Sequence, residues 1–279
     1  MVVFARIVLL CMWWCVGVVQ LAAEPYGFGV IRTERSGVMA QGYEPLLQYL
    51  RQQTGQDFVF VYTDSHGELI DRMEAGELHL AHMGPQPYIH LKERCPKAKA
   101  AALFLDAQGH SSYRCSLAVM ETSPLTSVAQ IQKSRLALTQ RYSTCGWLHP
   151  AVALQSVGAS LQESNYFFAG THVDAVMRLV LGEADVAAAQ SDIVDRYAHM
   201  GVRHLLISDP YPNFVLALSG IHLSKPLQQE IETALLKLDP QGALERSTWH
   251  PLVRYGAIPV DEAIFEPVRR QMQVAGQLP

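Results

Sequence analysis

Strands and helices are predicted to alternate directly after Tyr26, and this pattern restricts the possible folds more than any other feature of the chain. Three runs rich in β-forming residues are separated by two amphipathic segments, each followed by a glycine that ends a helix. We expect strands at 26–31, 58–62 and 78–83, helices at 43–53 and 66–75, and a loop at 37–42. Strand, helix and strand in such short succession predict parallel pairing with right-handed crossovers.

A second alternating unit is predicted from Leu125 onward, which gives an α/β protein with two lobes. Its expected strands are 135–139, 166–168, 185–189 and 204–207, and its expected helices are 147–157, 172–181 and 191–200. Two extended crossovers, near 113–120 and 210–218, would join the units into a hinged clamshell. Such folds bind small ligands at the carboxyl ends of the strands and close around them.

The predicted division of the chain follows from these crossovers. Residues 24–117 together with 214–279 would form lobe 1, and residues 118–213 would form lobe 2. Lobe 1 would then include a helix at 226–238 and a helical tail that reaches Gln273.

The stretch from Arg141 to Pro150 is the first candidate for a binding site. A short predicted strand ends just before it, and helical spacing of apolar residues begins at Trp147. Between them, Ser143 and Thr144 would stand at the positive end of the helix dipole, where unpaired backbone N–H groups bind anions. The alternative is that Ser143 or Thr144 only caps the helix.

The N-terminus has the features of a cleaved export signal. One positive charge precedes an unbroken apolar run at 7–19, and small residues precede Glu24. The run is shorter than the roughly twenty residues that a membrane-spanning helix needs. We therefore expect a signal peptide at 1–23, cleavage near Ala23, and an exported protein.

Composition excludes several classes of protein. Hydrophobic residues make up 49% of the chain and charged residues 17%, which is typical of a globular protein. The net charge of −4 provides no electrostatic basis for binding nucleic acid.

The cysteines leave several possibilities open. After loss of the signal peptide Cys95, Cys115 and Cys145 remain, and an odd number in an oxidising compartment leaves at least one thiol free or paired with another chain. Cys145 would stand at a helix start that favours its thiolate, and Cys115 would lie on a crossover that frames the same cleft. The two could form a disulfide, face the ligand as thiols, or be small buried residues. Cys95, before Pro96, is expected to be a surface thiol or to pair with another molecule.

Five motifs in order along the chain resemble those of one known family. They are Tyr-Glu-Pro-Leu at 43–46, Gly-Glu-Leu-His-Leu-Ala-His-Met-Gly-Pro at 76–85, Ser-Thr-Cys-Gly-Trp at 143–147, Ala-Gly-Thr-His at 169–172 and Gly-Glu-Ala-Asp-Val-Ala-Ala-Ala at 182–189. The chain is similar, from Tyr26 to about Met272, to the phosphonate, phosphite and phosphate periplasmic binding proteins of ABC transporters. The resemblance implies a type II periplasmic binding fold with the ligand held between the lobes.

The same resemblance implies particular ligand contacts. Ser143 and Thr144 match the first two residues of a Ser-Thr-Ser turn that holds a tetrahedral oxyanion, and Cys145 takes the place of the third. His172 matches a family histidine and could donate to a ligand oxygen or carry a positive charge. Without the resemblance, His172 would be interpreted as a solvent-facing residue at a helix start.

Three other positions depart from the family pattern. Met83 replaces an aromatic or hydroxyl-bearing residue, Ser65 with His66 stands where a pocket tyrosine is common, and Gln190 begins a segment that often carries an acidic or amide residue. We expect Met83, Ser65 and Gln190 to line the cleft. Asp192 could cap the next helix or bind an amino or hydroxyl group of the ligand.

The leading hypothesis is a monomeric, non-enzymatic solute-binding protein that captures a small oxyanion without cofactor or metal. Its membrane partner would be an ABC permease or a sensor histidine kinase. An alternative is an exported sensor of a thiophilic ligand such as arsenite, in which Cys115, Cys145 and Met83 would supply soft ligand atoms. A remote alternative is a hydrolase with Cys145 as nucleophile and His149, one helical turn further, as base.

Overall fold

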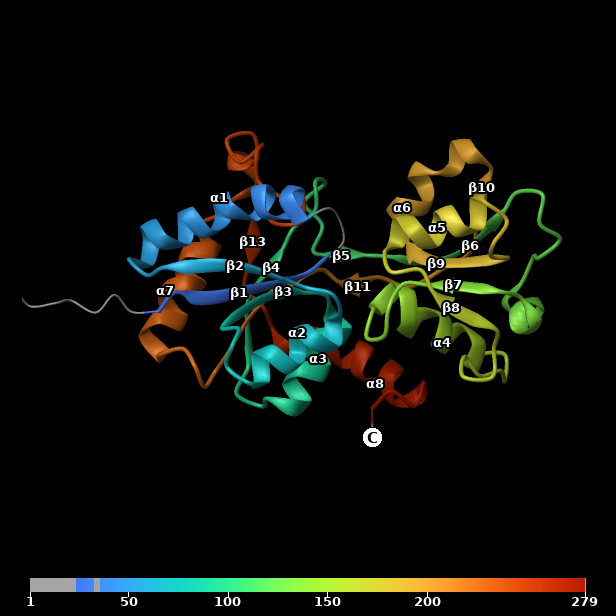
Figure 1. Cartoon of the computed structure of the whole chain (residues 1–279), viewed down its shortest axis with the longest axis horizontal. Helices are drawn as coiled ribbons and strands as arrows, with labels where there is room; N and C mark the ends of the chain where they lie inside the picture. Colours follow the sequence, from blue (N-terminus) through green and yellow to red (C-terminus); the bar gives the residue numbers. More distant parts are fainter. Residues whose placement is uncertain (1–23, 33–35, 279) are drawn as a thin grey trace, which may run out of the picture.

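The protein consists of two α/β lobes that lie side by side and are joined by a narrow connection (Figure 1). The computed structural model describes residues 24–32 and 36–278. The predicted signal peptide therefore lies outside the described residues. The predicted two-lobed α/β architecture is confirmed.

Lobe 1 is built on a six-stranded mixed sheet with the order β13-β4-β12-β3-β1-β2. The strands are β1 (Tyr26–Ile31), β2 (Phe58–Thr63), β3 (Leu80–Met83), β4 (Lys99–Phe104), β12 (Val215–Leu218) and β13 (Ala257–Ile258). β1 pairs in parallel with both β2 and β3, as the alternation predicted. β12 lies antiparallel between β3 and β4, so the chain returning from lobe 2 completes the sheet of lobe 1.

Helices cover both faces of this sheet. One core contains residues of α1 (Ser36–Thr54) and α7 (Lys225–Leu236), and the other contains residues of α2 (His66–Glu74), α3 (Pro85–Arg94) and α8 (Glu266–Val274). The predicted loop at 37–42 is wrong, because this segment is the first part of α1. Gly42 serves close packing instead: a Cβ added there would lie 3.1 Å from the Cβ of His250.

Lobe 2 has a five-stranded sheet with the order β10-β6-β9-β7-β8. The strands are β6 (Cys115–Met120), β7 (Leu136–Leu138), β8 (Tyr166–Phe168), β9 (Val186–Gln190) and β10 (Val202–Ile207). α5 (His172–Val180) and α6 (Ser191–Arg196) pack on one face, and α4 (His149–Gln155) packs on the other. The predicted helix at 147–157 begins as a π-helical turn, η2 (Thr144–Leu148), that continues into α4.

The two lobes are joined by paired short strands, β5 (Ser112–Tyr113) and β11 (Tyr211–Pro212), which run antiparallel. The whole of β6 belongs to the sheet of lobe 2, so the predicted boundary after Leu117 falls inside a strand. The crossovers are thus shorter than predicted. The C-terminal helix α8 adds a further link, because Phe265 beside it shares a core with Leu148 of lobe 2.

No helix within the described ranges is long and apolar enough to cross a bilayer.

Candidate functional site

A cavity of about 480 Å³ lies between the lobes and is lined by residues of both. Helices α2, α3, α5 and α6 and the turn η2 all begin at this cavity. Their first N–H groups and the positive ends of their dipoles therefore meet around one space. Such convergence favours a negatively charged ligand.

The turn that carries Ser143 and Thr144 is held in place from both sides. Ser143 Oγ accepts a hydrogen bond of 3.1 Å from the N–H of Gly146, so this hydroxyl caps the turn. Gly146 packs directly on the end of β7, because a Cβ there would lie 1.8 Å from Thr139 Oγ1. Thr139 Oγ1 lines the cavity, is buried and has no hydrogen-bond partner.

Tyr142, directly before this turn, has a strained backbone. Among the described non-glycine residues it alone has a positive φ, of 65°. Such a conformation costs on the order of 1–3 kcal/mol and persists only where the surroundings enforce it. The ring of Tyr142 packs edge-on against His90 of α3, with 4.5 Å between ring centroids. The strained residue therefore links the turn in lobe 2 to lobe 1.

Two imidazoles, one from each lobe, line the cavity close enough to interact electrostatically. His66 is the first residue of α2 and His172 the first residue of α5, and Nδ1 of each is buried without a partner. Burial and repulsion by His172 lower the pKa of His66 to about 3, and burial lowers the pKa of His172 to about 4. Both rings are neutral at pH 7, so each can donate one hydrogen bond and accept another.

Full charges are scarce around the cavity. Among its described lining residues only Asp192 and Arg196 carry them, and their side chains lie 3.9 Å apart on the same helix. Burial raises the pKa of Asp192. A bound anion would thus be stabilised by N–H groups, hydroxyls and neutral imidazoles more than by cations.

The lobes contact each other at the rim of the cavity. The N–H of His66 donates to Oε1 of Gln140 at 3.3 Å, and the N–H of Gln86 donates to Oγ1 of Thr144 at 3.2 Å. Each bond joins lobe 1 to lobe 2. The structure therefore represents a closed arrangement of the two lobes.

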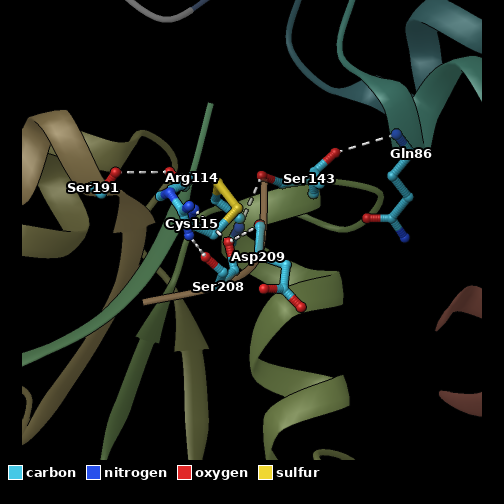
Figure 2. Close-up of a disulfide and its surroundings, with 10 residues drawn as sticks. Gln86, Arg114, Cys115, Ser143, Ser191, Ser208 and Asp209 are labelled. Carbon is cyan, nitrogen blue, oxygen red and sulfur yellow. Dashed lines mark hydrogen bonds between the residues drawn. A yellow bond between two sulfur atoms is a disulfide. The ribbon is translucent and has the colours of Figure 1, made fainter. Parts of the chain in front are cut away.

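A disulfide joins Cys115, at the start of β6, to Cys145 in the turn η2 (Figure 2). The surrounding backbone is held by further bonds: Ser208 Oγ accepts from the N–H of Cys115 at 2.9 Å, and Ser191 Oγ donates to the carbonyl of Arg114 at 3.1 Å. The disulfide connects the turn to the strand that directly follows the hinge. Because neither sulfur is a free thiol, the arsenite-sensor hypothesis and the hydrolase hypothesis based on Cys145 and His149 lose their chemical basis.

The structure brings together five of the eight residues that the sequence suggested for the site. These are Ser143, Thr144, Cys145, His172 and Gln190, which all line the cavity.

The other three, Met83, Ser65 and Cys115, do not line the cavity. Met83 is 1% exposed and packs in the core of lobe 1. Ser65 is the N-cap of α2 and accepts a hydrogen bond of 3.1 Å from the N–H of Glu68. Cys115 is buried at its disulfide. The expectation that Cys95 is a surface thiol is wrong as well, since this free cysteine is buried.

Two residues of lobe 1 that line the cavity, His66 and His82, were not predicted as site residues from the sequence. Where the sequence suggested Ser65, the neighbouring His66 lines the cavity, and where it suggested Met83, the neighbouring His82 does. His82 and Met83 are successive residues of β3, so their side chains point to opposite faces of the sheet, and only that of His82 reaches the cavity. Tyr43, Tyr113 and His250 also line the cavity, but they stand far apart in the sequence.

Two α/β lobes, a hinge of two short crossovers and a cavity lined by helix starts define the class of two-lobed, type II periplasmic binding proteins. Within this class, the profile of the family described as "ABC transporter, phosphonate, periplasmic substrate-binding protein" matches residues 28–264. The chain belongs to this family.

Known proteins resemble the chain in sequence and in fold. The phosphate-import protein PhnD of Mycolicibacterium smegmatis is 26% identical over 185 residues, which cover 62% of this chain and 57% of that relative. PhnD1 of Prochlorococcus marinus, solved with methylphosphonate, superposes with a TM-score of 0.78 at 12% identity, over 91% of this chain and 98% of that one. A binding component of a phosphonate ABC transporter from Pseudomonas aeruginosa has a TM-score of 0.78 at 18% identity, over 90% and 87%. The match thus spans little more than half the length of the curated relative, and the structural likenesses show a shared fold.

Proposed function

We propose that the protein captures a tetrahedral phosphorus oxyanion, a phosphonate, phosphite or phosphate, between its lobes. The observation that carries this proposal is a set of buried, unpartnered polar atoms around the cavity. They are Nδ1 of His66, Nε2 of His82, Oγ1 of Thr139 and Nδ1 of His172. Buried polar atoms are normally paired, so four such atoms around one cavity indicate a polar ligand.

Each part of the site would have a separate role. The backbone N–H groups of Thr144 and Cys145 and the hydroxyls of Ser143 and Thr144 would donate to the oxyanion, and the imidazoles of His66 and His172 would donate to further oxygens. Gln190 would contact the ligand from the edge of lobe 2. No covalent step is needed, because affinity would come from converging donors in a space closed to water.

An ABC permease of the inner membrane is the partner that this proposal implies. The family match to transporter components favours a permease over a sensor kinase. We further propose that the mature protein begins after cleavage near Ala23 and acts as a periplasmic monomer.

The test is a double substitution, Ser143→Ala with Thr144→Ala, followed by thermal-shift measurements. The ligands are phosphate, phosphite, methylphosphonate, sulfate, arsenate and arsenite. We expect phosphorus oxyanions to stabilise the unaltered protein by about 2.7 kcal/mol at a hundredfold excess over the dissociation constant. The double variant should lose this stabilisation, while its empty form melts within a few degrees of the unaltered protein.

Ser224→Ala is a matched control, because Ser224 caps α7 by accepting from the N–H of Leu227 and does not line the cavity. It should lose a helix cap worth about 1 kcal/mol and keep its binding. Undiminished binding by the double variant would contradict the proposed site.

A further inference from the structure

The cavity is much larger than a bare oxyanion requires. Its volume is about 480 Å³, whereas one water molecule takes about 30 Å³ and an anion of five heavy atoms takes about the space of three waters. A volume of this size is ordinary for organic ligands. Part of the cavity wall has a composition that suits such a ligand.

This part, here called the lobe-1 chamber, is formed by side chains of lobe 1 alone. Its residues are Val30, Met39, Tyr43, His82, Phe214 and Leu252. Val30 lies in β1, Met39 and Tyr43 lie in α1, and His82 lies in β3, so all four belong to lobe 1. Opening or closing of the lobes about the hinge therefore moves these four residues together.

The walls of the lobe-1 chamber present flat rings. The ring of Tyr43 stacks on His250 with 4.5 Å between centroids, and His82 stacks on Phe214 with 5.2 Å between centroids. Val30 and Met39 add an apolar floor. Stacked rings beside aliphatic side chains favour a planar, apolar group of the ligand.

His82 supplies a polar atom within these walls. Its Nδ1 lies 3.0 Å from the hydroxyl of Tyr43, while its Nε2 is buried without a partner. The His82 side chain is almost completely buried at 3% exposure. An imidazole nitrogen fixed in this way is suited to a hydrogen bond with a polar atom on an otherwise apolar group.

The lobe-1 chamber contains no charged side chain among its described residues. Burial, with repulsion by His250, lowers the pKa of His82 to about 3, so its ring is neutral at pH 7. An ammonium group beside these six side chains would lose its hydration without gaining a carboxylate from them. The chamber thus favours an uncharged group over an aminoalkyl group.

The lobe-1 chamber opens beside the turn that carries Thr144. At Gly84 an added Cβ would lie 3.6 Å from the hydroxyl of Tyr113, 3.7 Å from Oγ1 of Thr144 and 3.8 Å from the ring of Phe214. One point in space is thus in contact with both the turn of lobe 2 and the chamber of lobe 1. A single ligand can occupy both.

From these observations we propose that the ligand is an oxyanion that carries an uncharged, planar organic group, aromatic or heteroaromatic, and that the lobe-1 chamber holds this group. The inference rests on the proposed function, because the oxyanion is the part held by Ser143 and Thr144. It adds the class of substituent that the protein selects.

The experiment compares dissociation constants by isothermal titration calorimetry for methylphosphonate, 2-aminoethylphosphonate, phenylphosphonate and benzylphosphonate. We expect one of the two aromatic phosphonates to bind at least tenfold more tightly than methylphosphonate, and the aminoethyl compound to gain nothing over it. Leu252→Trp, which fills the chamber from its partly exposed edge, should remove the aromatic preference and leave methylphosphonate binding within about threefold. Leu252→Met is the matched control and should retain the preference.

The outcomes separate this inference from the proposed function. If methylphosphonate binds as tightly as both aromatic compounds, the inference is overturned while the proposed function stands. An aromatic preference that survives Leu252→Trp would also overturn it, because the group would then lie elsewhere. If no phosphonate, phosphite or phosphate binds, the proposed function itself is wrong.

Discussion

The two walls of the cavity are constructed in different ways. The lobe-2 wall is formed by the starts of η2, α5 and α6, and its turn η2 is held by a disulfide and directly follows a strained residue, Tyr142. The lobe-1 wall includes the starts of α2 and α3 and, beside them, side chains such as Tyr43 and His82 that are part of the hydrophobic core or pack on it. Backbone donors held by covalent and steric constraints suit the oxyanion, which is the group that all candidate ligands share. Core side chains can be substituted, which alters the shape of the chamber, so they suit the organic group in which the ligands differ. Both lobes would thus contribute donors to the oxyanion, whereas the side chains that would set selectivity lie in lobe 1.

Acid is expected to have the largest effect, because it acts on imidazoles of both walls. Burial is the main cause that lowers the pKa of His66 and of His82 to about 3 and of His172 to about 4, against 6.5 for an exposed histidine. Below pH 6.5 the unfolded chain therefore binds protons that the folded protein does not, so stability falls as the pH falls. Each group contributes up to about 1.4 kcal/mol per pH unit, which predicts a loss of about 4–6 kcal/mol between pH 6.5 and pH 5 for these three.

Denaturant titrations of the empty protein at several pH values measure this loss. His82→Phe removes an imidazole from the lobe-1 wall and His172→Phe removes one from the lobe-2 wall. Each substitution should remove the uptake of about one proton on unfolding. The slope of the unfolding free energy against pH should therefore fall by up to about 1.4 kcal/mol per pH unit. A slope near zero from pH 7 to pH 5 would show that these imidazoles are not buried in neutral form.

Loss of the disulfide should affect the lobe-2 wall alone. The bond joins cysteines separated by 30 residues, and removing such a cross-link costs about 3–4 kcal/mol of unfolding free energy. Cys115→Ala with Cys145→Ala should lower the melting temperature accordingly and weaken methylphosphonate binding about tenfold, or about 1.4 kcal/mol. The ratio of aromatic to methyl affinity should stay constant, because the lobe-1 chamber is unchanged.

Cys95→Ala is the control for this substitution, since Cys95 is buried and forms no disulfide. It should keep oxyanion affinity. If the double variant changed the ratio of affinities instead of their common level, the two walls would not be independent.

Gly84→Ala is expected to have the smallest effect and examines the place where the walls meet. The backbone there has φ −74° and ψ 176°, which alanine adopts without strain, and the added methyl group would make ordinary contacts with both walls. Stability should therefore change by less than about 1 kcal/mol. Binding of a ligand that spans both walls should weaken about tenfold, equivalent to about 1.4 kcal/mol, and that of phosphate should weaken less. Calorimetry with phosphate and benzylphosphonate checks this, and equal losses for both would contradict the proposed position of the junction.

The sequence by itself determined the local structure and the turn that we propose as the oxyanion site. Runs of β-forming residues and apolar residues at helical spacing were sufficient to predict most strands and helices of both lobes. Ser143 and Thr144 were recognisable because a helix start with hydroxyl residues is a local pattern. Resemblance to a family added His172, which periodicity alone would have left at a solvent-facing helix start.

Only the tertiary structure decided which distant segments meet. It paired Cys115 with Cys145, brought His66 near His172, and assembled the lobe-1 chamber from β1, α1, β3 and the segment around Leu252. It also made Gly42 part of a helix, because the packing of α1 against His250 outweighs the weak helix propensity of glycine. The physical reason is that periodicity encodes which face of an element is apolar, whereas the partner of that face is set by packing across the whole lobe.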